Sequence, residues 1–405
     1  MRLRLFALML LVSTFSYAQK FPGLALTPPM GWSSWNTFGT RINEELIKGI
    51  ADYMVSSGMR DAGYTYINLD DGWSTRTRDS ITGDLVADPV KFPSGMKALA
   101  DYVHSKGLKF GLYNCGGTMT CAKYPGSHGY EEQDARLYAS WGVDYLKYDW
   151  CFSEGFDAQA SYKKMSQALK DAGRPVVFSL CEWGTTKPWT WAREVGHLWR
   201  ISGDIGNVFD GIKQYDTWHS LGVMRIVDLA ADLYPYASPG AWNDPDMMEV
   251  GNGQTETQDK THFSIWCMMA APLMAGNDLT KMSDTTIRIL TNKDAIAIDQ
   301  DKMGWQGFRY SNVDSLQVWF KPLENDEWAV CFVNRSNKTK SLNFDWKKEA
   351  VVYPTNQKAL NAGKLEYELY DVWEKKSRGT TKKKFSARLE KHSSVMMRMK
   401  VVGSE

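Results

Sequence analysis

Acidic side chains follow short apolar runs at five places in the chain. Their sequences are NLDDGW at 68–73, YLKYD at 145–149, LCEW at 180–183, WRISGD at 199–204 and WNDPDM at 242–247. If the runs are parallel strands of a barrel, their carboxyl ends meet on one face, where the acids would converge. Carboxylates accept hydrogen bonds from hydroxyl groups, and tryptophan rings can stack on flat ligands. The pattern therefore indicates a pocket for a sugar.

Two of these acids have the surroundings that glycoside hydrolysis requires, namely two carboxyl groups in different protonation states. Lys147 lies two residues before Asp149, so both face the same side of a strand and the ammonium group would keep Asp149 ionised. Asp204 follows a turn that contains Gly203 and can direct its carboxyl at a leaving-group oxygen. Arg200 could orient a carboxylate or bind a hydroxyl. We expect Asp149 to be the nucleophile and Asp204 the general acid.

Each signal has a plainer explanation when taken alone. A single aspartate after a strand is more often a helix cap, and Asp244 and Asp246 flank a proline and could be turn residues. Lys147 and Asp149 could form a structural ion pair. A metal site is a further alternative, with four aspartates as oxygen ligands: Asp70, Asp71, Asp244 and Asp246. The six histidines show neither an H-x-H nor an H-E-x-x-H pattern, which weakens a zinc site. The coincidence of five acidic strand ends favours catalysis, and we expect no metal and no cofactor.

Helical and strand patterns alternate from about residue 29 to 300, in units of roughly 30–45 residues. Helices are expected over 43–58, 96–103, 131–141 and 161–172, several of them ending at a glycine. Eight strands are expected near 30–35, 65–70, 109–114, 145–149, 176–181, 198–203, 238–243 and 272–276. This count predicts an α/β fold, a (β/α)₈ TIM barrel. No G-x-G-x-x-G turn or P-loop supports a nucleotide site.

The pattern changes after about residue 302, where short strands follow one another without a helical period. A hairpin is expected from 316–320 and 328–333, with further strands at 342–344, 369–372, 385–389 and 395–399. These segments predict an antiparallel β-sandwich after the barrel. The expected division is a signal peptide at 1–18, a catalytic barrel at 19–301 and a C-terminal sandwich at 302–405.

Composition excludes several classes of protein. The 405 residues carry 48 Lys and Arg against 47 Asp and Glu, which removes the electrostatic case for a nucleic-acid partner. The 43% hydrophobic and 23% charged residues exclude disorder. Arg2 and Arg4, the apolar run 5–15 and the small residues Ser16 and Ala18 are typical of a signal peptide cleaved after Ala18. We expect an exported protein, periplasmic or secreted, with no membrane attachment after cleavage.

The six cysteines are too few for a disulfide scaffold. Cys267 and Cys331 lie in apolar runs and are expected as buried free thiols. Cys121 and Cys151 are plausible disulfide partners. Cys115 is close enough in sequence to compete for the same bridge, so the pairing stays open.

Seven ordered motifs make the chain resemble the α-galactosidase / α-N-acetylgalactosaminidase family of retaining glycosidases, glycoside hydrolase family 27. They are PMGWSSWN at 29–36, NLDDGW at 68–73, GYEEQD at 129–134, WGVDYLKYD at 141–149, LCEW at 180–183, WRISGD at 199–204 and WNDPDM at 242–247. The resemblance implies that Asp149 is the nucleophile and Asp204 the acid/base of a double displacement, with the carboxyl groups about 5–5.5 Å apart.

The resemblance also implies which residues bind the sugar. Asp70 and Asp71 would bind the O4 and O6 hydroxyls, Lys147 would bind O3 and O4, and Glu182 and Arg200 would lie on the O2 side. The rest of the expected substrate-binding set is Trp35, Tyr113, Cys181, Asp246 and Met247. Trp35, Trp73, Trp183 and Trp242 lie at expected strand ends, where a sugar would bind.

Glu182 distinguishes between members of this family. Relatives that accept an N-acetyl group resemble one another in having a small residue there, so a glutamate favours galactose. Asp70 would leave room for a hydroxymethyl group, which favours an α-galactoside over a β-L-arabinopyranoside. The expected function is hydrolysis of terminal α-D-galactosides in oligosaccharides or polysaccharides. A β-L-arabinopyranosidase, an α-N-acetylgalactosaminidase, and a sugar-binding protein on a decayed barrel are the alternatives.

Two positions depart from the usual family pattern. Trp150 follows the expected nucleophile where relatives usually have Asn or Gly. Cys115 and Gly116 stand where many relatives have Asp and then Ala or Val. Both departures are expected at the mouth of the pocket, where they would affect the preferred leaving group.

Overall fold

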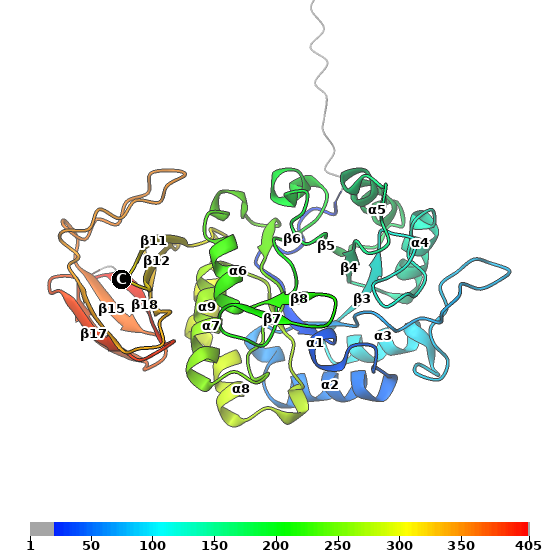
Figure 1. Cartoon of the computed structure of the whole chain (residues 1–405), viewed down its shortest axis with the longest axis horizontal. Coiled ribbons are helices and arrows are strands. Elements are labelled where there is room, and N and C mark those ends of the chain that lie inside the picture. The colour runs from blue at the N-terminus through cyan, green and yellow to red at the C-terminus, as the bar shows by residue number, and fades with distance from the viewer. Residues whose placement is uncertain (1–19, 404–405) are drawn as a thin grey trace, which may run out of the picture.

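Eight parallel strands form a barrel in the computed structural model, which describes residues 20–403 (Figure 1). The strands are β1 (Met30–Ser33), β2 (Tyr66–Asn68), β3 (Lys109–Cys115), β4 (Tyr145–Asp149), β5 (Val177–Cys181), β6 (Leu198–Arg200), β9 (Trp242–Asp244) and β10 (Leu273–Ala275). They pair in the order β10-β1-β2-β3-β4-β5-β6-β9. The segment after β9 closes the ring, because Met248 N–H donates to the Met274 carbonyl and Gly276 N–H donates to the Met248 carbonyl. The predicted TIM barrel is confirmed, with all eight strands near their expected positions.

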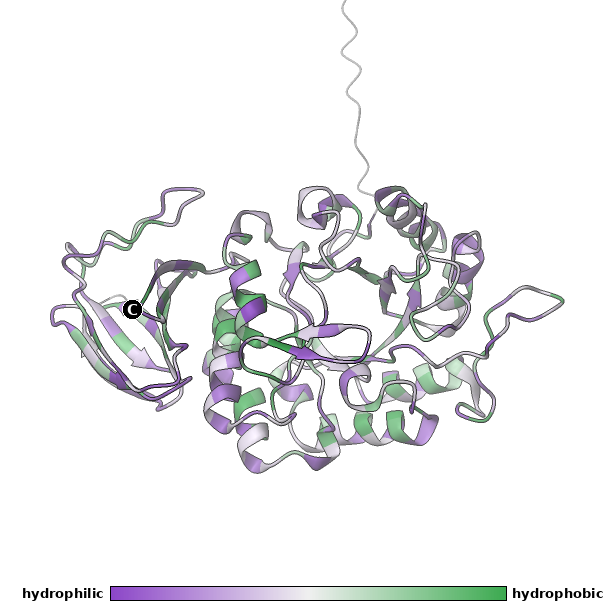
Figure 2. Cartoon of the chain, in the orientation of Figure 1, coloured by the Kyte–Doolittle hydropathy of each residue, from purple (hydrophilic) through white to green (hydrophobic). Residues whose placement is uncertain are grey.

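Helices cover the outside of the barrel, except for the short first helix, which directly follows β1 at the carboxyl end of that strand. They are α1 (Trp35–Phe38), α2 (Glu44–Ser56), α3 (Gly95–Ser105), α4 (Glu131–Trp141), α5 (Ala158–Asp171), α6 (Val223–Ala230), α7 (Glu256–Met268), α8 (Asp284–Leu290) and α9 (Lys293–Asp299). Short 3₁₀ turns occur at Arg60–Ala62, Pro188–Thr190, Ala192–Glu194, Tyr234–Tyr236 and Leu279–Lys281. Two of these turns, and no α-helix, connect β5 to β6. Ribbons of the outer helices carry both hydrophobic and hydrophilic bands (Figure 2).

Local sequence signals explain where several of these helices begin and end. The Asn43 side chain accepts a hydrogen bond from Leu46 N–H and caps α2, as its type predicts. Helix α4 ends at Gly142, whose φ of 84° suits a residue without a Cβ. Helix α5 begins three residues earlier than expected, because Asp157 accepts a hydrogen bond from Ala160 N–H and supplies a cap.

A sandwich of antiparallel strands follows the barrel. One sheet pairs in the order β11-β12-β13-β18-β15-β16, and a second consists of β14 and β17. The strands are β11 (Phe308–Val313), β12 (Leu316–Pro322), β13 (Trp328–Asn334), β14 (Lys340–Phe344), β15 (Tyr367–Asp371), β16 (Lys376–Thr380), β17 (Phe385–Leu389) and β18 (Ser394–Val401). The predicted sandwich is confirmed. Strands β11 and β16 were not predicted, because β11 is only partly buried, β16 is largely exposed, and neither has a strict apolar alternation.

The sandwich packs against the barrel through one face of its larger sheet, which contacts α7 (Figure 1). Strand β13 is buried along its whole length. Ala329, Cys331 and Val333 join the core that includes the barrel, whereas Val330 and Phe332 join the core inside the sandwich. This two-sided burial explains why β13 is apolar without a polar face.

One disulfide joins Cys121 to Cys151, which are 30 residues apart in sequence. A cross-link of this span stabilises the fold by about 3–4 kcal/mol in the chain-entropy account. Cys115 is a buried free thiol, and its S–H donates to the Cys151 carbonyl at 3.1 Å. Cys181, Cys267 and Cys331 are also buried free thiols.

The expected signal peptide and its cleavage after Ala18 lie outside the described residues. Across residues 20–403, no helix combines the length and the apolar character needed to cross a bilayer.

Candidate active site

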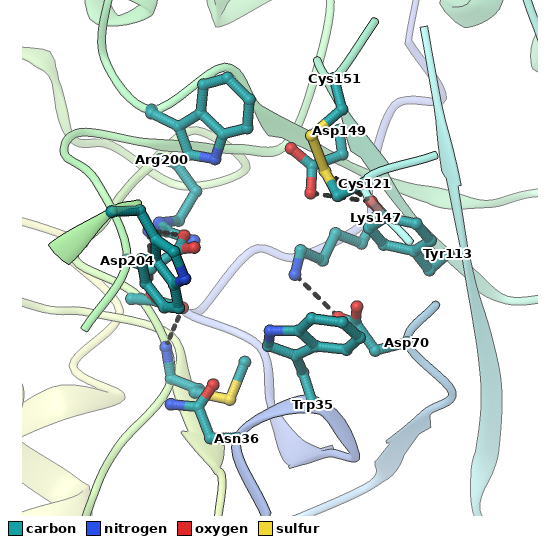
Figure 3. A pocket seen from close by; sticks show the side chains of 14 residues that line it. Trp35, Asn36, Asp70, Tyr113, Cys121, Lys147, Asp149, Cys151, Arg200 and Asp204 are labelled. Atoms are coloured by element: carbon teal, nitrogen blue, oxygen red, sulfur yellow. Dashed lines mark hydrogen bonds and ion pairs between the residues drawn. A yellow bond between two sulfur atoms is a disulfide. The ribbon is translucent and has the colours of Figure 1, made fainter. Parts of the chain in front are cut away.

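A pocket of about 400 Å³ opens at the carboxyl ends of the barrel strands (Figure 3). This volume is in the range of small-molecule sites. Fourteen residues line the pocket: Trp35, Asn36, Asp70, Tyr113, Cys121, Lys147, Asp149, Cys151, Trp183, Arg200, Asp204, Trp218, Asp246 and Met247. The barrel thus gathers at one place side chains that lie up to 212 positions apart, from Trp35 to Met247.

Asp149, the last residue of β4, lies deep in the pocket and is 5% exposed. Its carboxylate accepts hydrogen bonds from the Tyr113 hydroxyl at 3.0 Å and from Trp150 N–H at 2.9 Å. Burial raises the pKa of Asp149 to about 7, the Lys147 ammonium opposes this rise, and the negative charges of Asp204 and Asp70 add to it. We expected Lys147 to keep Asp149 ionised. Its ammonium group does lower the pKa of Asp149, but burial raises that pKa by more.

Lys147 and Asp70 form an ion pair on the floor of the pocket. The Lys147 Nζ lies 2.7 Å from an Asp70 carboxylate oxygen and 5.3 Å from the centre of the Tyr113 ring. Nearby carboxylates hold the pKa of Lys147 above its usual range although burial lowers it. Asp70 N–H donates to the Ser34 hydroxyl at 2.9 Å, so the end of β1 fixes the end of β2. The pair offers a cation and an anion to neighbouring hydroxyl groups of a ligand.

Arg200 links two further acids on the other side of the pocket. Its guanidinium lies 3.0 Å from an Asp204 oxygen and 2.8 Å from an Asp246 oxygen. The Asp204 side chain is 40% exposed, whereas those of Arg200 and Asp246 are buried. Burial raises the pKa of Asp246 to about 6 against the effect of Arg200. Asp204 and Asp149 enter the pocket from different sides, with Asp204 nearer to solvent (Figure 3).

Three residues of the expected substrate-binding set do not line the pocket. Asp71 is buried and accepts a hydrogen bond from Ala122 N–H, so it holds the neighbouring loop. Cys181 is buried behind Arg200, which lies 3.6 Å from its sulfur. Glu182 is fully buried, and the Thr185 hydroxyl and Thr186 N–H donate to its carboxylate. These three side chains lie behind the lining residues, and their contact with the sugar stays a prediction.

Two of the four tryptophans at expected strand ends also lie elsewhere. The Trp73 ring N–H donates to the Tyr113 carbonyl, and the Trp242 ring N–H donates to the Ala25 carbonyl. Both rings are buried and belong to the barrel core. Only Trp35 and Trp183 of the four face the pocket.

The pocket also includes four residues to which the sequence analysis gave no binding role: Asn36, Cys121, Cys151 and Trp218. Asn36 follows an expected strand end, so its position was the available signal, and the two cysteines were expected only as disulfide partners. Trp218 follows no barrel strand and carried no such signal. It belongs to a hairpin of β7 (Ile212–Gln214) and β8 (His219–Leu221) that was not predicted, because these strands lack an apolar alternation.

The two departures from the family pattern form one packed unit away from the pocket. Neither Trp150 nor Cys115 and Gly116 line it, which corrects their expected place at its mouth. The Trp150 ring packs on Tyr162 of α5 with centroids 5.5 Å apart. A Cβ on Gly116 would come within 2.9 Å of the Trp150 ring. The absence of a side chain at Gly116 therefore leaves the space that the Trp150 ring occupies.

The four aspartates considered as metal ligands do not form a ligand set. Asp70 is paired with Lys147, and Asp246 with Arg200. Among residues 20–403, the one group of His, Cys, Asp and Glu side chains close enough to share an ion is Cys121, Asp149 and Cys151. Its two sulfur atoms are already bonded to each other.

Comparison with known proteins identifies relatives of both parts of the chain. A family model described as alpha galactosidase A matches residues 27–301, and one described as the alpha galactosidase C-terminal beta sandwich domain matches 313–399. The alpha-galactosidase A of Cellvibrio japonicus (strain Ueda107) is 48% identical over 390 residues, which are 96% of each chain. The alpha-galactosidase 2 of Arabidopsis thaliana is 47% identical and covers 92% of this chain and 89% of its own.

A solved structure extends this similarity to three dimensions. The α-galactosidase from Saccharomyces cerevisiae, determined with raffinose, superposes with a TM-score of 0.86 at 32% identity. The match covers 95% of this chain and all of the yeast chain.

Proposed function

Because this chain belongs to the alpha galactosidase A family, glycoside hydrolase family 27, and hydrolyses terminal α-galactosides, we propose that Asp149 is its nucleophile and Asp204 its acid/base. The observation that carries this proposal is the pair of unlike carboxyl groups in one pocket. Asp149 is buried and fixed by Tyr113, whereas Asp204 is half exposed and held by Arg200.

In the first step, an ionised Asp149 oxygen attacks the anomeric carbon as the bond to the leaving oxygen breaks. Asp204 gives its proton to that oxygen, so the leaving group departs as a neutral alcohol. In the second step, Asp204 takes a proton from water, and the water oxygen displaces Asp149 from the anomeric carbon. Two inversions give net retention and restore both carboxyl groups to their starting states.

The other lining residues have distinct proposed roles. Tyr113 positions Asp149 through its hydroxyl, and Arg200 stabilises Asp204 when it becomes ionised. The Asp70–Lys147 pair binds hydroxyl groups on the galactosyl ring. Trp35 and Met247 contribute apolar surface for the ring carbons.

Glu182 is the proposed discriminating residue on the O2 side. One of its carboxylate oxygens accepts hydrogen bonds from the Thr185 hydroxyl and from Thr186 N–H, and the other has no hydrogen-bond partner among the described residues. We propose that this second oxygen accepts a hydrogen bond from the O2 hydroxyl of galactose. Relatives named α-galactosidases at 48% and 47% identity support an α-galactoside over an arabinopyranoside or an N-acetylgalactosaminide.

We also infer that the protein is exported, from the charged, apolar and small-residue order of positions 1–18. The proposed mature chain comprises a catalytic barrel over 19–301 and a sandwich over 302–405. The matches to separate family models at 27–301 and 313–399 support a division in this region.

A comparison of three aryl glycosides tests the substrate and the nucleophile together. The enzyme should hydrolyse the α-galactoside much faster than the α-N-acetylgalactosaminide and the β-L-arabinopyranoside. Asp149→Asn should reduce turnover of the α-galactoside by about 10⁴-fold or more, because the amide cannot form the glycosyl ester. Asp157→Asn is the matched control, since asparagine caps α5 as well as aspartate does. Wild-type-like turnover by Asp149→Asn would refute the assignment.

A further inference from the structure

The loop that carries Asp204 is held by an ion pair from the sandwich. Arg335, the first residue after β13, places its Nε 2.6 Å from one Asp210 oxygen and an Nη 2.8 Å from the other. Its second Nη lies 2.5 Å from Asp228 of α6. A guanidinium that grips one carboxylate at two points fixes direction as well as distance. The sandwich lies on the side of the barrel that carries α6 and α7 (Figure 1).

A second turn of the sandwich holds the neighbouring residue of the same loop. The His392 ring, between β17 and β18, stacks on the buried Phe209 ring with centroids 4.4 Å apart. The Thr261 hydroxyl of α7 donates to the His392 carbonyl, and the Gln258 side chain is hydrogen-bonded to the His392 ring. Residues 209 and 210 are therefore fixed by two separate segments of the sandwich.

Backbone hydrogen bonds connect this anchored point to Asp204. Gly222 N–H donates to the carbonyl of Gly211, the residue next to Asp210, at 2.9 Å. Leu221, the residue before Gly222, donates its N–H to the Asp204 carbonyl at 2.8 Å. The two bonds leave from adjacent residues, so a displacement at Asp210 would move the backbone of Asp204.

Asp204 depends on this loop more than Asp149 depends on its own surroundings. Asp149 is part of a barrel strand, whereas Asp204 lies four residues after β6 ends at Arg200. The Asp204 side chain is also 40% exposed. A general acid works only within hydrogen-bond reach of the oxygen that it protonates. The loop therefore decides whether Asp204 is correctly placed.

We propose that Arg335 is a positioning residue for the acid/base, and that the sandwich takes part in the reaction by holding the Asp204 loop. This inference rests on the proposed role of Asp204. Arg335 does not line the pocket and acts only through Asp210. Its loss should impair proton donation by Asp204 more than attack by Asp149.

Two substrates with the same galactosyl group separate these two effects. Methanol leaves methyl α-galactoside only with a proton from the acid, whereas fluoride leaves α-galactosyl fluoride as an anion. We expect Arg335→Met to lower kcat/KM for the methyl galactoside by about tenfold. The loss on the fluoride should be at least about threefold smaller. Asp210→Ala breaks the same pair from the barrel side and should show the same selective loss.

Arg309→Met is the matched control. Arg309 also extends from the sandwich to Asp228, at 2.6 Å, and is buried to a similar degree, but it pairs with Asp228 and not with Asp210. Its loss should leave the ratio of the two activities at the wild-type value. Arg335→Lys keeps a cation and should recover part of the activity on the methyl galactoside. Combining Arg335→Met with Asp210→Ala should cost no more than either change alone.

Losses that differ between the two substrates by less than about threefold in Asp210→Ala would overturn the inference and leave the proposed roles intact. This variant leaves the sandwich unchanged, so it decides the question even where Arg335→Met fails to fold. Asp204→Ala is the reference for a missing acid and should lose far more activity on the methyl galactoside than on the fluoride. Equal losses in Asp204→Ala would instead overturn its role as the acid, and the inference with it.

Discussion

The protonation of Asp149 depends on two opposing features of its surroundings. Burial favours the neutral acid, and the Lys147 ammonium favours the carboxylate. Since the nucleophile must be ionised in the free enzyme, kcat/KM should fall as the pH drops below the pKa of Asp149. Burial is the larger effect on this pKa. The acidic limb of the pH profile, where kcat/KM falls, should therefore lie well above the ordinary pKa of an aspartate, toward pH 7.

Two neutralising variants should move this limb in opposite directions. Lys147→Met removes the cation that lowers the pKa of Asp149, so its limb should shift to higher pH. Asp70→Asn removes an anion that raises the same pKa, so its limb should shift to lower pH. The measurement is the pH profile of kcat/KM on an aryl α-galactoside. Shifts of both variants in the same direction would contradict this electrostatic account.

Part of the site could be predicted from the positions of its residues relative to the barrel strands. Asp149, Arg200 and Asp246 stand at or just after strand ends, and every barrel strand end opens on the same face. Glu182 also comes just after a strand end, and Asp71 comes three residues after β2, but their side chains turn into neighbouring loops. Strand periodicity cannot predict that turn, because it no longer applies after the strand ends.

At the scale of elements, the loop after β3 and the loop after β4 are packed against each other. Gly116 leaves the space that the Trp150 ring occupies, and Trp150 in turn packs on α5. The sequence alone shows two separate departures from the family pattern at these positions. Only the contact shows that they form one unit.

A double-mutant cycle measures this coupling. Gly116→Ala should destabilise the fold by about 1–3 kcal/mol, because its Cβ would lie 2.9 Å from the Trp150 ring. The same substitution should cost much less in a Trp150→Gly background, where the ring is absent. The free energies of unfolding of the wild type and the three variants give the interaction energy. Strictly additive effects would mean that the two positions are independent.

Helices such as α2 and α3 were predictable because they bury one side and expose the other, and barrel strands such as β1 and β5 because they are short apolar runs that are buried throughout. The β7–β8 hairpin was not, since its strands IKQ and HSL have no such pattern and are stabilised by bonds to the Asp204 segment. Strand β16, with the sequence KSRGT, escaped prediction for the same reason.

For the molecule as a whole, a buried lysine connects the sandwich to the barrel. Lys321 of β12 is fully buried, and its ammonium donates to the carbonyls of Cys267, Ile298 and Asp299. Burial lowers the pKa of Lys321, while burial raises the pKa of the nearby Asp299 to about 8. The sheet thus satisfies the carbonyl groups at the ends of two barrel helices.

Removal of this lysine should weaken the contact between the sandwich and the barrel. Lys321→Met keeps the length of the side chain but leaves three buried carbonyls without their donor, so we expect a loss of about 3 kcal/mol in the free energy of unfolding. Lys302→Met, at an exposed position, should change it by less than about 0.5 kcal/mol. Urea unfolding of the full chain provides both values. Equal stability of the two variants would show that the ammonium contributes nothing to this contact.

The central claim is the division of roles between Asp149 and Asp204, and azide with α-galactosyl fluoride tests it most directly. In Asp149→Gly, azide takes the place of the missing nucleophile and should give β-galactosyl azide by a single inversion. In Asp204→Gly, Asp149 still forms the glycosyl-enzyme, and azide should open it to α-galactosyl azide by a second inversion. The anomeric configuration of each product, read by NMR, decides between the roles. Reversed configurations, or the same anomer from both variants, would contradict the account.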